Sequence, residues 1–142
     1  MEKYHHVKQI KLQQYPVFLV IAISNNYDKL VEDRLLDKSV IAEINPNYAY
    51  TFFDGKIEGL YSVIILLGLF KEERSILLED LVHEINHAGN RILAHIEAKP
   101  DWINDEQESY LKSWIASEIQ SMMVENNITF KLFESKCTKE GD

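Results

Sequence analysis

The feature that most constrains the fold is an uninterrupted apolar run, Val-Phe-Leu-Val-Ile-Ala-Ile, at residues 17–23. The run follows Pro16, precedes the polar residues Ser24 and Asn25, and is rich in β-branched side chains. An apolar run of this length between turn-forming residues is typical of a buried β-strand. Because it is far shorter than the roughly 18 residues of a membrane-spanning helix, we expect a strand of a soluble domain.

A β-hairpin is expected next. Residues 48–53 are mostly aromatic, residues 56–67 are mostly apolar, and Asp54 and Gly55 stand between them. An Asp-Gly pair between two strand-like runs is a favoured type I′ turn. The sequence therefore predicts that the chain reverses at Asp54–Gly55.

The other regular elements are expected to be helices. Apolar residues in three stretches recur at helical spacing, about 100° apart per residue, and each stretch has a capping or a stopping residue at one end. The expected helices cover residues 27–37 after a cap at Asn25 or Asn26, residues 72–98 before Pro100, and a last stretch from Asn104 or Asp105 to Glu125.

The order of these elements predicts an α+β fold. In it, a small, mainly antiparallel sheet with a hairpin packs against a long helix and a C-terminal helix. The length of 142 residues fits a single domain, which we expect to cover residues 1–134, with a solvated tail at 135–142.

Charge and cysteine content exclude several classes of function. The formal net charge of −8 argues against proteins that bind the nucleic-acid backbone or an anionic membrane surface. The single cysteine, Cys137, allows neither an internal disulfide nor a cysteine-built zinc finger. Since the N-terminus lacks the layout of a secretory signal, we expect a cytoplasmic protein.

The long helix carries the informative motif, His83-Glu84-x-x-His87, which is the H-E-x-x-H pattern of zinc peptidases. Side chains four residues apart on a helix are neighbours, so two imidazoles can reach one Zn²⁺. Glu84 would act as a general base on the attacking water. With Ile85 at zero degrees, the two histidines lie at about 160° and 200°, opposite the apolar stripe, facing a cleft or solvent.

Such a zinc site needs a third protein ligand. Leu93 occupies the position of the third metzincin histidine, and His95 lies about 12 Å beyond His87 along a continuous helix, so His95 is expected at the surface or partly packed. His5 and His6 are expected to be exposed at the chain end. A carboxylate remains, and Glu106 and Glu108 are the two candidates.

The sequence resembles the gluzincins, zinc metallopeptidases with H-E-x-x-H, then about eighteen residues, then a zinc-binding Glu. It is closer still to small zincin-like proteins of bacteriophages, through VHEINHA at residues 82–88 and DEQESYL at 105–111. The resemblance implies His83, His87 and Glu106 as ligands of Zn²⁺ and Glu84 as base.

One position departs from the family pattern. Thermolysin-like enzymes place an Asp four residues after the ligand Glu, where it orients a histidine, and Tyr110 stands there in this chain. Asp80 or Asn90 would have to take over that role. Tyr110 is either a catalytic hydrogen-bond donor to a developing oxyanion or an amphipathic residue at the edge of the apolar stripe.

The function that the resemblance implies is zinc-dependent hydrolysis of peptide or amide bonds, by a phage-encoded or phage-like protein acting on a peptide or protein in the host cytoplasm. The aromatic hairpin is either the edge on which zincins lay an extended peptide or ordinary cross-strand packing. The alternative is a non-catalytic, small acidic binding or inhibitor protein with a structural or vestigial zinc site.

Overall fold

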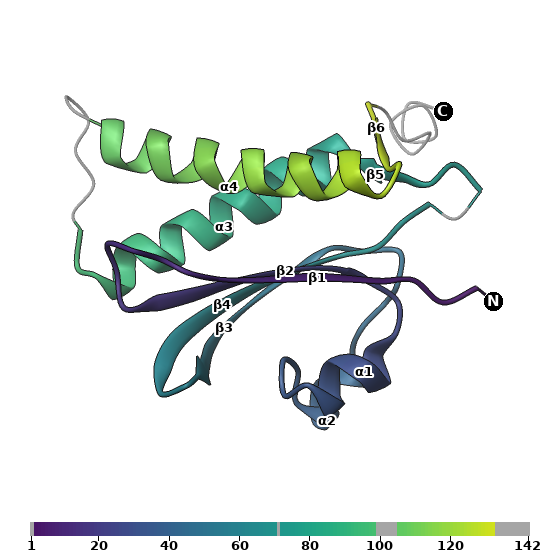
Figure 1. Ribbon diagram of the computed structural model, residues 1–142, viewed down its shortest axis with the longest axis horizontal. Coiled ribbons are helices and arrows are strands. Elements are labelled where there is room, and N and C mark those ends of the chain that lie inside the picture. The colour runs from purple at the N-terminus through teal and green to yellow at the C-terminus, as the bar shows by residue number, and fades with distance from the viewer. Residues whose placement is uncertain (1, 71, 99–104, 133–142) are drawn as a thin grey trace, which may run out of the picture.

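The computed structural model describes residues 2–70, 72–98 and 105–132, and it confirms an α+β fold. The predicted order of a strand, a short helix, a hairpin and two long helices is present, with further elements between and after them (Figure 1). The elements are β1 (His5–Lys11), β2 (Val17–Ser24), α1 (Tyr27–Glu32), α2 (Lys38–Ile41), β3 (Tyr50–Ile57), β4 (Leu60–Leu67), β5 (Ser75–Leu77), α3 (Leu78–His95), α4 (Glu106–Glu125) and β6 (Thr129–Lys131).

The main sheet has four strands in the order β1-β2-β4-β3. The outer pairs, β1 with β2 and β3 with β4, are antiparallel, whereas the central pair, β2 with β4, is parallel. β5 and β6 form a separate parallel pair. The sheet is therefore mixed, with its antiparallel pairings at the two edges.

Helices cover the two faces of this sheet (Figure 1). α3 and α4 pack on one face and α1 lies under the other. Alternate residues of a strand point to opposite faces, so Leu19, Ile21 and Ile23 of β2 contact the α3–α4 side while Val20 and Ala22 contact the α1 side. This burial on both faces explains why β2 reads as a continuous apolar run.

The predicted hairpin exists, but its turn is four residues further along the chain than expected. Glu58 and Gly59 form the turn with φ angles of 51° and 80°, the positive values that a type I′ turn requires. The expected turn at Asp54–Gly55 is wrong, because β3 continues through it with a register irregularity between Phe52 and Gly55. A Cβ on Gly55 would lie 2.8 Å from the Ser62 hydroxyl oxygen, so that glycine allows close packing inside the hairpin.

Several element boundaries also differ from the prediction. The first helix ends at Glu32 instead of residue 37, and α3 begins at Leu78 because the preceding residues form β5. β1 was not predicted, and it places His5 in a partly buried position with Nδ1 2.7 Å from the Ser24 hydroxyl. The expected exposure of His5 and His6 at the chain end is therefore wrong, because both lie partly buried in β1. The expected tail at 135–142 and Cys137 lie outside the described residues.

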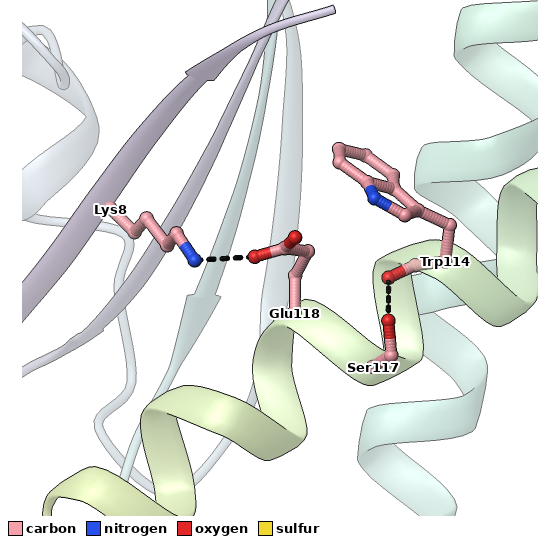
Figure 2. Close-up of polar contacts among 4 residues, drawn as sticks. All are labelled: Lys8, Trp114, Ser117 and Glu118. Carbon is pink, nitrogen blue, oxygen red and sulfur yellow. Dashed lines mark hydrogen bonds and ion pairs between the residues drawn. The ribbon is translucent and has the colours of Figure 1, made fainter.

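α4 is fixed to the edge strand β1 by an ion pair between Lys8 and Glu118, which Figure 2 shows. One turn earlier, Trp114 packs against the core, and its carbonyl accepts a hydrogen bond of 2.8 Å from the Ser117 hydroxyl (Figure 2). The ion pair and the packing of Trp114 thus connect α4 with β1 and with the core. In the part of the chain that the structure describes, no helix is long and apolar enough to cross a membrane.

Candidate metal centre

His83 and His87 lie on the outward side of α3, opposite the residues that pack on the sheet. Both imidazoles are exposed, as the periodicity of the helix predicts. Their Nε2 atoms are 3.0 Å apart, and the two rings meet edge to face with centroids separated by 4.5 Å. The helix therefore brings two imidazole nitrogens within hydrogen-bond distance of each other.

This separation fits two ligands of one ion. Two nitrogens bound to a tetrahedral Zn²⁺ at 2.0–2.1 Å are about 3.3 Å apart. Without an ion, neutral imidazoles at 3.0 Å share an N–H···N hydrogen bond in which one ring donates and the other accepts. The pair thus has the geometry for divalent-cation binding by residues of a single helix.

Glu84 follows His83 by one residue and turns toward the sheet. Its side chain is buried, with a residue exposure of 6%, and its carboxylate accepts a hydrogen bond of 2.8 Å from the Thr51 hydroxyl of β3. The same hydroxyl lies 3.3 Å from the Glu84 carbonyl oxygen. Burial of a carboxylate is costly without such a donor, so Thr51 holds Glu84 in place between α3 and the edge strand.

An open groove of about 510 Å³ runs beside these residues. His83 and Glu84 form one wall of it, and the segment that enters β3 forms the other. The groove therefore joins one imidazole of the pair, the buried acid and the edge of the sheet in one accessible space. It is lined by Tyr48, Ala49, Tyr50, Glu79, Asp80, His83 and Glu84.

The third ligand is not assembled among the described residues. Within residues 2–70, 72–98 and 105–132, no group of three or more His, Cys, Asp or Glu side chains is arranged to hold a metal ion. Glu106 is the first residue of α4 and follows its N-cap residue Asp105, and its side chain is not without an interaction. Its role as a ligand stays a prediction.

Glu108, the rival acid, is engaged by Lys112 one turn later. The Lys112 ammonium also donates a hydrogen bond of 2.6 Å to the Asn86 side chain on α3. Gly89 makes room for this lysine, because a Cβ there would lie 2.7 Å from Lys112 Cγ. Glu108 is thus linked through Lys112 to Asn86 of α3, the residue before His87.

Tyr110 of α4 lines a groove other than the one beside His83. It is 71% exposed and lines a separate groove with the β1–β2 turn, near Tyr15 and Trp114. No described contact joins Tyr110 to His83, His87 or Glu84. Its position agrees with an amphipathic surface residue, and its catalytic role stays a prediction.

The sequence motif did not identify every residue of this site. Thr51 was missed, because only the packing of α3 against β3 brings its hydroxyl to Glu84. His95, expected at the surface or partly packed, is exposed and stacks on Tyr61 with ring centroids 4.1 Å apart. Asp80, one of the two residues expected to orient a histidine, lines the groove beside His83.

Comparison with known proteins gives no relative from which a function could be transferred. No protein-family model, no curated protein and no solved structure matches this chain.

Proposed function

We propose that the chain is a zinc-dependent hydrolase of peptide or amide bonds. His83 and His87 would hold Zn²⁺ with Glu106 as the third ligand, and Glu84 would be the general base. The observation that carries the proposal is the convergence of the two Nε2 atoms to 3.0 Å beside the groove that Glu84 lines. In this arrangement His83, one of the candidate metal ligands, and Glu84, the candidate base, line the same groove.

The chemistry divides between the metal and the protein. Zn²⁺ held by two imidazoles and a carboxylate supplies Lewis acidity, which polarises a carbonyl and makes water nucleophilic at neutral pH. Glu84 would accept the proton of the attacking water and pass it to the leaving nitrogen. Thr51 would keep one carboxylate oxygen of Glu84 fixed during this transfer.

The edge strand β3 supports a peptide as substrate. β3 is the last strand of the order β1-β2-β4-β3, so its outer edge has no strand partner among the described residues. An extended peptide can pair with such an edge through main-chain hydrogen bonds. Thr51 of this strand contacts Glu84, which would place a peptide bound along β3 next to the acid.

Metal content and cleavage test the proposal together. The purified chain should take up one equivalent of Zn²⁺, and His83→Ala should abolish this uptake while Glu84→Gln preserves it. A mixture of quenched fluorescent peptides should be cleaved by the wild type and not by Glu84→Gln. Zinc uptake with no cleavage would favour the non-catalytic binding protein, and cleavage that survives Glu84→Gln would remove the proposed base.

A further inference from the structure

Arg91 follows His83 and His87 at the same four-residue spacing along α3. It follows His87 by four residues, which places its Cα about 6 Å further along the helix and rotates it about 40° toward the side on which Glu84 lies. Its side chain is exposed. Arg91 therefore lies one helical turn beyond the imidazole pair and faces the same edge of the sheet.

Phe53 of β3 holds the guanidinium group in position. The Cζ atom of Arg91 lies 3.7 Å from the centroid of the Phe53 ring, a cation–π contact. Phe53 is two residues after Thr51, so both side chains point from β3 toward α3. Along this interface, the Thr51–Glu84 contact is followed by the Phe53–Arg91 contact.

The N–H groups of Arg91 have no acidic partner in the part of the chain that the structure describes. The four ion pairs found there use Lys8, Lys29, Lys112 and Lys131. A guanidinium that contacts a ring through its carbon keeps N–H groups at its rim, and their fork matches a carboxylate. The Arg91 guanidinium is thus held by the Phe53 ring, and its N–H groups can bind a carboxylate one helical turn from His87.

We propose that Arg91 selects substrates that carry a carboxylate about two residues from the bond that is cut, an inference that rests on the proposed hydrolase function. The spacing follows from the 6 Å between His87 and Arg91 along the helix, since an extended peptide advances about 3.3 Å per residue. The carboxylate belongs to an acidic side chain or to the C-terminus of the peptide. The net charge of −8 does not oppose this contact strongly, because distant charges are screened beyond about 8 Å at physiological salt.

Binding of matched peptides to full-length Glu84→Gln protein, with and without added zinc, tests the inference. One series of fluorescein-labelled, amide-capped peptides carries a single Glu at successive positions, with Gln as the control. A second series has no acidic side chain and ends in a free carboxylate or an amide. We expect at least one acid to bind about tenfold tighter than its amide control, as a charge-assisted hydrogen-bonded pair requires.

The variants assign this preference to Arg91. Arg91→Gln should remove the preference and Arg91→Lys should retain part of it, because lysine keeps the charge and loses the fork. Arg34→Gln, which removes an exposed arginine from the chain between α1 and α2, is the matched control and should bind as the parent does. Equal binding of acids and amides, undetectable binding of both, or a preference that survives Arg91→Gln overturns the inference. Failure of the hydrolase proposal is seen separately, as absent zinc uptake and absent cleavage by the wild type.

Discussion

The Thr51 hydroxyl donates a hydrogen bond of 2.8 Å to the Glu84 carboxylate across the contact between β3 and α3. This bond joins the acid of the H-E-x-x-H motif to the edge strand β3. It therefore connects the residue proposed for chemistry with the strand proposed for peptide binding, and it makes Thr51 as informative a target as the motif itself.

Removing the Thr51 hydroxyl should destabilise the protein. Thr51→Val leaves the buried Glu84 carboxylate without its donor, so we expect the free energy of unfolding to fall by about 1–3 kcal/mol in urea denaturation. Thr51→Ser keeps a hydroxyl and should lose much less. A Val variant as stable as the wild type would show that the bond does not hold Glu84.

Glu84→Gln should separate catalysis from folding and metal binding. The amide oxygen of glutamine can still accept the Thr51 hydrogen bond, so the urea midpoint and zinc content should stay near wild type. Peptide cleavage should fall by about 10²–10⁴-fold, the usual contribution of a general base. Measuring all three properties on the same preparation guards against contaminating protease.

Replacing each of the two candidate acids of α4 with glutamine shows which of them binds zinc. Glu106→Gln should weaken zinc binding, measured by competition with a chelating dye. Glu108→Gln should leave zinc affinity unchanged, because Glu108 is paired with Lys112. The opposite ranking would make Glu108 the third ligand, and wild-type zinc affinity in both variants would exclude both acids as ligands.

The sequence predicted the elements whose burial follows a simple pattern. The apolar run of β2 and the stripes of α3 and α4 were recognised because each buries a continuous or periodic set of side chains. The outward placement of His83 and His87 followed from the same periodicity. These predictions needed no knowledge of how the elements pack together.

The sequence did not predict features that depend on contacts between different elements of the fold. β1 lies at the sheet edge and has only two aliphatic residues, Val7 and Ile10, so it carries no strand-like pattern, and its Lys8 forms an ion pair with Glu118 of α4. The hairpin contains two pairs that end in glycine, Asp54–Gly55 and Glu58–Gly59. Gly55 packs closely on Ser62 inside the hairpin, and Glu58–Gly59 forms the turn. The contacts of Thr51 and Arg91 become visible only when β3 is packed against α3.

His6 gives the folded state a dependence on pH. Burial lowers the pKa of His6 from its usual 6.5, and the charges of Arg74 and His5 lower it further. The unfolded chain therefore binds the proton more readily, so the stability contribution of neutral His6 is complete above about pH 6.5 and is lost as pH falls toward the lower pKa of the folded state.

Replacing His6 isolates this effect from the other histidines. The urea midpoint of the wild type should fall between pH 7.5 and pH 5.5, and it should fall by less in His6→Gln. A His95→Gln variant, which changes an exposed histidine, should keep the wild-type dependence. An unchanged fall in His6→Gln would contradict the linkage.

Thermal unfolding with and without zinc tests the central claim, that His83 and His87 form one metal site. At a free zinc concentration about 100 times its dissociation constant, the wild type should gain about 2.7 kcal/mol and its Tm should rise. Because both imidazoles are exposed, His83→Ala and His87→Ala should fold normally and show no rise, while His95→Ala should respond as the wild type does. A wild-type Tm that zinc leaves unchanged, or an equal rise in all four proteins, would contradict the account.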